Sequence, residues 1–217
     1  MILLADVFEK FIKISVEKNG INPLYCVSLP GYTWQCGMKY TDINLQTLQD
    51  KDMILLLENN IRGGISSVMG DRYVQSDNKK KILYVDANIL YGWAMSKYLP
   101  YDEVKFDRKV KLKDIIITPD ESDIGYFIEV DLKYPDNIKE KTKKLPFAPM
   151  NKKINPDNFN DFMKEIKPDI YIQTKNLICD WSDKEKNFIR YRMLKFHIRH
   201  GMEVVKVHNV TSFKQSM

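Results

Sequence analysis

The first nineteen residues show a helical pattern of apolar positions. The apolar positions are Leu3, Leu4, Val7, Phe8, Phe11 and Ile12. Their spacing of three and four predicts a helix over residues 2–19, which Gly20 ends. A loop containing Pro23 and Pro30 is expected next, followed by a second helix over residues 50–60 that breaks at Gly63-Gly64.

Three later segments have the pattern of strands. Residues 82–85 are all apolar and lead into Asp86, residues 125–134 alternate apolar and charged side chains, and residues 202–213 are strand-like. A short helix ending near Tyr98 is expected after the first of them.

The remaining segments predict helix and loop. Ser182 and Glu185 have the spacing of a capping box, which predicts that a helix opens there. Its apolar stripe is Phe188, Tyr191, Leu194 and Ile198, and Gly201 lies at its end. The prolines and lysines of residues 135–156 predict extended, loop-rich structure. Helices that alternate with strands indicate a mixed α/β or α+β fold.

The composition is that of an ordinary globular protein, with 44% hydrophobic and 29% charged residues among 217. The longest aliphatic run, Met53–Leu57, is far shorter than a membrane span, so no membrane partner is expected. The net charge of +5 is compatible with a polyanionic partner but does not require one. The three cysteines have no CxxC spacing, so neither zinc nor a disulfide framework is indicated, and a reducing intracellular compartment is favoured.

The stretch KILYVDANILYGWAMSKYLP, residues 81–100, places one carboxylate, Asp86, at the end of an apolar run. The carboxyl end of a strand is a frequent position for a metal ligand, because it is rigid and open to solvent. Magnesium prefers oxygen ligands, which the Asp86 carboxylate and the Ala87 carbonyl would supply. The N–H groups that open the next helix would face a triphosphate, and Tyr91 would contact the sugar. An aspartate at such a turn is most often an N-cap or a solvated loop acid, so spacing alone does not select a metal site.

The motif YVDANILYGWAM resembles the first catalytic motif of family B DNA polymerases, the D-x-N-x-L-Y pattern of the protein-primed branch. It is most similar to polymerases of Polinton/Maverick transposons and related viral or plasmid elements. The resemblance implies that Asp86 is the catalytic residue that binds both magnesium ions, with Ala87 as a backbone metal contact.

The same resemblance assigns the nucleotide site. The implied nucleotide-binding residues are Ala87, Asn88, Ile89, Leu90 and Tyr91. Tyr91 would be the steric gate that excludes ribonucleotides from the incoming deoxynucleoside triphosphate. Gly92 stands where phage and plasmid members usually have proline, and the transposon members match more closely here.

A second element, IRGGIS, lies at residues 61–66. It resembles the Y-x-G-G element that joins the exonuclease and polymerase regions of this branch and holds the template strand. The implied DNA-binding residues are Arg62, Gly63 and Gly64, because paired glycines allow a phosphate chain to approach the backbone closely. Ile61 stands in place of the tyrosine, and a simple helix stop is the alternative.

The resemblance extends over nearly the whole chain. LLADVFEKF at residues 3–11 is similar to the helix of the third exonuclease motif, whose metal-binding acid would precede Leu3. The implied regions are the end of an exonuclease region with its linker at 1–75, the first palm segment at 76–101, and an α/β insertion at 102–217. That insertion resembles terminal-protein region 1, so the implied fold is a partial family B palm.

Two parts of a polymerase site have no counterpart in the sequence: the D-T-D motif with the second acid and the K-x-x-x-N-S-x-Y-G fingers helix. The expectation is a fragment that does not polymerise alone and whose parent uses Mg²⁺, a DNA template-primer, deoxynucleoside triphosphates and a terminal priming protein. Two alternatives stay open. One is a catalytically dead DNA-binding or interaction module, and the other is an unrelated nucleotide-binding enzyme with a second carboxylate close to Asp86.

The segment after Ser182 is basic. Its cationic residues are Lys184, Lys186, Arg190, Arg192, Lys195 and Arg199. Such a helix face is most often simply solvated, and contact with template, primer or terminal protein is the second interpretation.

Overall fold

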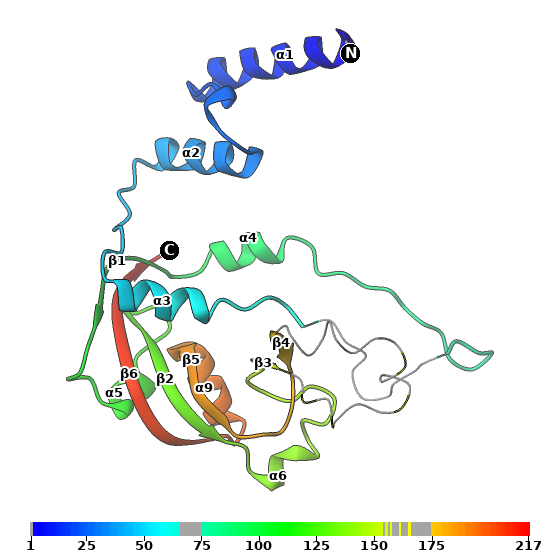
Figure 1. Cartoon of the computed structure of the whole chain (residues 1–217), viewed down its shortest axis with the longest axis vertical. Coiled ribbons are helices and arrows are strands. Elements are labelled where there is room, and N and C mark those ends of the chain that lie inside the picture. The colour runs from blue at the N-terminus through cyan, green and yellow to red at the C-terminus, as the bar shows by residue number, and fades with distance from the viewer. Residues whose placement is uncertain are drawn as a thin grey trace. The chain divides into compact units, whose positions relative to one another are not determined.

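The structure is a computed structural model that describes residues 2–65, 75–153, 155, 157, 161, 165 and 175–217. The chain forms two compact units, Met1–Gln46 and Thr47–Met217. Helices and an antiparallel sheet are both present (Figure 1), so the predicted mixed α/β class is confirmed. Among the described residues, no helix is long and apolar enough to cross a membrane.

The first unit is helical. It consists of α1 (Ile2–Asn19), the short 3-10 helix η1 (Pro23–Tyr25) and α2 (Leu29–Thr41). Tyr32 of α2 joins α2 to α1, because its hydroxyl accepts a 2.8 Å hydrogen bond from Asn19 and its ring packs edge to face against Phe11. The predicted helix over 2–19 is confirmed.

The prediction of a loop around Pro23 and Pro30 is wrong for the residues of α2, which begins at Leu29. Ser28 caps this helix by accepting a hydrogen bond from the Gly31 N–H, and Pro30 lies in the first turn. A proline costs nothing there, because the first-turn N–H groups have no partner within the helix.

The second unit is built on a four-stranded antiparallel sheet with the strand order β1-β6-β2-β5. The strands are β1 (Leu99–Phe106), β2 (Ile124–Lys133), β5 (Lys184–Arg190) and β6 (Glu203–Ser216). The long β6 lies between β1 and β2 and pairs with both. Thr211 of β6 is opposite Phe106 of β1 on one side and opposite Phe127 of β2 on the other. The strands predicted at 125–134 and 202–213 are therefore confirmed.

Helices cover both faces of this sheet (Figure 1). Helices α5 (Leu112–Ile117) and α9 (Tyr191–Arg199) lie on one face, where Ile115, Leu194 and alternate residues of β2 form the main core. Helix α3 (Lys51–Asn59) lies on the other face, and its buried Met53 contacts Thr211 of β6. The helix predicted over residues 50–60 is confirmed as α3, and Asp50 caps it by accepting a hydrogen bond from the Met53 N–H.

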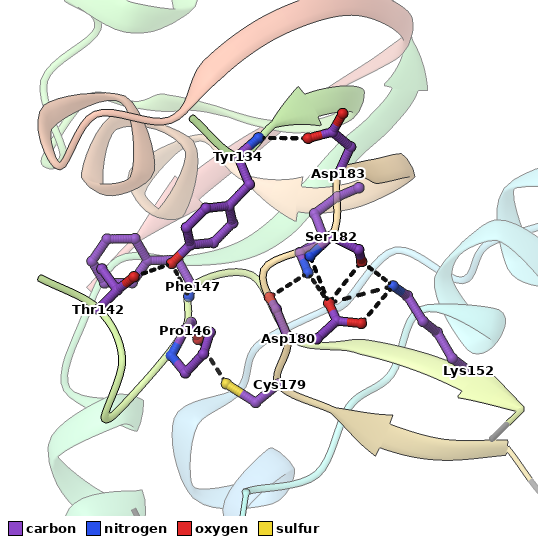
Figure 2. A network of polar contacts seen from close by, with 10 residues as sticks. Tyr134, Thr142, Pro146, Phe147, Lys152, Cys179, Asp180, Ser182 and Asp183 are labelled. Carbon is purple, nitrogen blue, oxygen red and sulfur yellow. Dashed lines mark hydrogen bonds and ion pairs between the residues drawn. The ribbon is translucent and has the colours of Figure 1, made fainter. Parts of the chain in front are cut away.

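A polar network fixes the connection into β5 (Figure 2). The Asp180 carboxylate pairs with Lys152 of β3 (Met150–Lys153) at 3.0 Å and with Lys184, whose side chain is fully buried. Strand β4 (Lys175–Ile178) pairs with β3 to form a two-stranded antiparallel sheet. The network thus anchors this small sheet to the four-stranded sheet.

The segment between β2 and β3 is also bonded to the connection that leads into β5. Asp183 accepts a 2.7 Å hydrogen bond from the Tyr134 N–H, and the Tyr134 hydroxyl bonds Thr142 at 2.5 Å (Figure 2). Helix α6 (Asp136–Lys139) lies in the segment between them. The segment 135–153 is therefore mostly irregular, as its prolines predict.

The helix predicted to open at Ser182 begins nine residues later, at Tyr191. Residues 184–190 form β5, in which Phe188 stacks on Phe127 on one face of the sheet while Ile189 joins the core on the other. Burial on two opposite faces requires a strand. The capping-box spacing is therefore coincidental, although the stripe from Tyr191 onward does lie on a helix.

Candidate functional site

Asp86 lies in an exposed segment of the second unit. Residues 81–87 have no regular secondary structure, so the strand predicted over 82–85 is wrong. A strand requires a neighbour for its backbone N–H and C=O groups, and the described sheet pairs β1, β2, β5 and β6 without this segment. The four apolar side chains at 82–85 are 64–91% exposed.

The predicted helix after Asp86 is present as α4 (Leu90–Met95). It begins after Ile89, whose φ of 59° is in the left-handed region that a β-branched residue rarely adopts. The Ile89 carbonyl accepts a 2.9 Å hydrogen bond from the Trp93 N–H, which closes the first turn. The predicted nucleotide segment therefore contains a strained backbone position, a feature enriched at functional sites.

The side chain of Ile89 accounts for the glycine at position 92. A Cβ added to Gly92 would lie 2.5 Å from Ile89 Cγ2, which is closer than van der Waals contact permits. Ile89 and Gly92 are therefore a matched pair in this conformation. A larger residue at position 92 would require the Ile89 side chain to move.

The side chains around Asp86 face solvent. Asp86, Ala87, Asn88 and Leu90 are all exposed, and Tyr91 is 88% exposed. A carboxylate and a backbone carbonyl in this setting are accessible to a hard cation and fit the ligand type that magnesium prefers. Among the described residues, no three His, Cys, Asp or Glu side chains are grouped to hold a metal ion. Asp86 and Ala87 can thus supply only part of a magnesium site.

The predicted DNA-binding element is only partly exposed. Arg62 Nη2 donates hydrogen bonds to Asn187 Oδ1 at 2.7 Å and to the Phe188 carbonyl at 3.3 Å, both in β5. Burial lowers the pKa of the Arg62 guanidinium. Gly63 and Gly64 are exposed and have open space where a Cβ would stand, so packing does not demand glycine at either position. Ser66 lies outside the described residues.

No pattern in the sequence indicates that α4 and α9 share a pocket. Trp93 and Lys97 line a pocket of about 680 Å³ together with Arg192, Lys195 and Arg199 of α9. The basic helix face that the sequence predicts is thus placed beside the segment that follows Asp86. The pairing of β1 with β6 and the hydrogen bond from Arg190 to the Tyr98 carbonyl bring these distant segments together.

Cys179 directly precedes Asp180 of the polar network. Its thiol donates to the Pro146 carbonyl (Figure 2), and burial raises its pKa. A thiol with a raised pKa has little of the reactive thiolate at neutral pH.

Comparison with known proteins yields no relative: no family model, no curated protein and no solved structure matches this chain.

Proposed function

We propose that this chain is part of a DNA-directed DNA polymerase of the protein-primed family B type. The observation behind the proposal is the stretch YVDANILYGWAM, which resembles the D-x-N-x-L-Y motif of that family in its acid, its turn and its aromatic residue. The exposure of Asp86 and Tyr91 and the helix that opens at Leu90 support it, because a nucleotide and a metal ion must reach these groups from solvent.

In this proposal Asp86 and the Ala87 carbonyl hold magnesium. When bound, magnesium would stabilise the negative charge that develops as the primer 3′-hydroxyl attacks the α-phosphate and pyrophosphate leaves. Asp86 orients the ion through its carboxylate oxygens. Asn88, Ile89 and Leu90 contact the triphosphate, and Tyr91 limits the space at the 2′ position of the sugar.

The proposal assigns the remaining metal ligand and the triphosphate-binding cation to other segments of the full-length polymerase. The chain by itself should therefore extend no primer in the presence of Mg²⁺ and four deoxynucleoside triphosphates. Robust extension by the purified chain would contradict this division of the site.

The catalytic role is tested in the full-length polymerase that contains this chain. Asp86→Ala should abolish primer extension, because no other ligand replaces the lost carboxylate. Asp77→Ala is the matched control, since Asp77 is also exposed and its carboxylate accepts hydrogen bonds from the nearby backbone N–H groups of Lys79 and Lys80. Wild-type turnover in Asp86→Ala, or equal losses in both variants, would refute the metal role.

A second candidate function is a catalytically dead DNA-binding or interaction module on a palm-like scaffold. The basic and aromatic pocket between α4 and α9 favours it, because that pocket does not involve Asp86. The sequence downstream in the same reading frame discriminates the two. The motifs K-x-x-x-N-S-x-Y-G and D-T-D would support the polymerase, whereas a stop with no remnant of them would support the module.

A further inference from the structure

The pocket between α4, the start of β1 and α9 combines apolar and cationic side chains. Its apolar lining includes Trp93, Leu99, Met193 and Phe196, all of which belong to the exposed large hydrophobic residues of the protein. Exposed aromatic rings beside cations are the two components that single-stranded nucleic acids require, one for the bases and one for the phosphates.

The cationic side chains of helix α9 lie on one face because they recur at helical spacing. Tyr191 and Leu194 are fully buried in the core, and they direct the opposite face outward. Arg192, Lys195 and Arg199 recur at intervals of three and four residues and therefore share that outer face. The positive face of the pocket is thus fixed by the packing of the core.

The charge of the pocket is only partly compensated. Among the described residues that line the pocket, Asp120 is the one carboxylate, and it pairs with Arg192 at 3.0 Å and with Lys195. Partial burial would raise the pKa of Asp120, but the hydrogen bonds and positive charges of Lys195 and Arg192 together outweigh it, and the pKa is lowered. Asp120 therefore stays ionised and holds these two cations in place.

Arg190 is committed to the fold, whereas two further cations are available. Arg190 donates to Gln215 Oε1 at 2.7 Å and to the Tyr98 carbonyl. Lys97 Nζ lies 4.8 Å from the centre of the Trp93 ring, and Arg199 is exposed with no ion pair among the described residues. Lys97 and Arg199 are the cations free to bind an anionic ligand.

We propose that this pocket binds single-stranded DNA, with bases stacked on Trp93 and Phe196 and phosphates at Lys97 and Arg199. A cation beside an exposed indole favours a ligand that carries both flat rings for stacking and negative charges. A nucleic acid has both, whereas an acidic peptide supplies the charge without the bases. The choice of DNA rests on the proposed function, but the binding requires neither magnesium nor Asp86.

The test is fluorescence anisotropy of a labelled oligothymidylate of about 12 nucleotides with the full chain, in EDTA. Trp93→Ala should weaken binding by roughly 5- to 150-fold, the equivalent of one lost stacking contact. Lys97→Glu and Arg199→Glu should weaken binding and make it less dependent on salt, because each removes a phosphate contact. Lys113→Glu on α5 is the matched control, since Lys113 is exposed and lies outside the pocket.

The outcomes separate this site from a general charge effect. Binding that is unchanged in Lys113→Glu, lost in Lys97→Glu and retained in Lys97→Arg supports the pocket. Equal losses of affinity in Lys97→Glu and Lys113→Glu would overturn it. So would polyglutamate that competes as effectively as unlabelled oligonucleotide. Absence of binding at low salt would overturn it as well. Because EDTA removes metal ions, failure here leaves the role of Asp86 open to its own assay.

Discussion

Arg62 of the IRGG element donates a 2.7 Å hydrogen bond to the side chain of Asn187, which lies 125 positions later and is fully buried. This bond joins the segment after α3 to β5. It satisfies the Asn187 oxygen, which the sheet alone would leave without a donor. A residue that the resemblance assigns to DNA binding therefore also holds the fold together.

Removal of the Arg62 side chain should destabilise the protein. Arg62→Ala leaves the buried Asn187 oxygen unpaired, so the free energy of unfolding should fall by about 2 kcal/mol in a urea denaturation series. Arg108→Ala is the control, because Arg108 is exposed. In a double-mutant cycle with Asn187→Ala, most of this loss should appear as coupling between the two residues. An Arg62→Ala protein of unchanged stability would show that this bond contributes nothing.

Because the ammonium group of Lys184 is buried, substitution of its partner Asp180 should also destabilise the protein. Although partial burial would raise the pKa of Asp180, hydrogen bonds from Lys184, Ser182 and Lys152 hold it well below its usual range. Asp180→Ala should cost about 3 kcal/mol of unfolding free energy, because it leaves a buried charge without its partner. The second change Lys184→Met should restore much of that loss.

The control for Asp180 is an exposed ion pair. Asp136 pairs with Lys139 on the surface, and its side chain is 93% exposed. Asp136→Ala should therefore leave the unfolding curve unchanged. Similar losses from Asp180→Ala and Asp136→Ala would contradict the role given to burial.

The sequence predicts those parts of the fold whose pattern is local. Helix α1 and strands β2 and β6 have regular apolar spacing along their own length, and each is found where expected. Helix α2 was missed because a proline in the first turn has the same local appearance as a proline in a loop. In β5, partners on both faces of the sheet override the helical capping pattern at Ser182.

The candidate site is less predictable than the fold. The acid and the aromatic at 86 and 91 are recognisable from a short motif, because their roles depend on local spacing. The pocket of α4 and α9 depends on residues that are 92 positions apart, such as Tyr98 and Arg190. No local pattern records that contact. The internal bond of Arg62 was equally invisible, because its partner becomes a neighbour only when β5 joins the sheet.

Acid should destabilise the protein through His197. This side chain is buried beside Phe147 and Phe196, and burial, reinforced by the nearby Arg62 charge, lowers its pKa to about 4 from an ordinary value of 6.5. The folded state then binds fewer protons than the unfolded state between these values. Stability should be unaffected above pH 6.5 and should fall by about 3 kcal/mol as the pH drops to 4.

The measurement is a set of urea denaturation curves between pH 4 and pH 7.5. His197→Gln should flatten the decline below pH 6.5, because the buried group that resists protonation is gone. The control His200→Gln changes an exposed neighbour whose charge is a smaller cause of the lowered pKa than burial, so it should change the slope far less than His197→Gln. Identical slopes in wild type and His197→Gln would exclude His197 as the cause.

Tyr91 should decide the choice of sugar if the proposed function is correct. The ring is 88% exposed, so replacing it removes no packing, and an effect on activity must come from contact with the substrate. In the full-length polymerase, Tyr91→Val should raise ribonucleotide incorporation relative to deoxynucleotide by on the order of a hundredfold, because the 2′-hydroxyl no longer meets a ring. Tyr84→Val is the matched control, since Tyr84 is 91% exposed and precedes Asp86. Single-nucleotide incorporation with each substrate gives the ratio directly, and a ratio that shifts equally in both variants would remove Tyr91 from the nucleotide site.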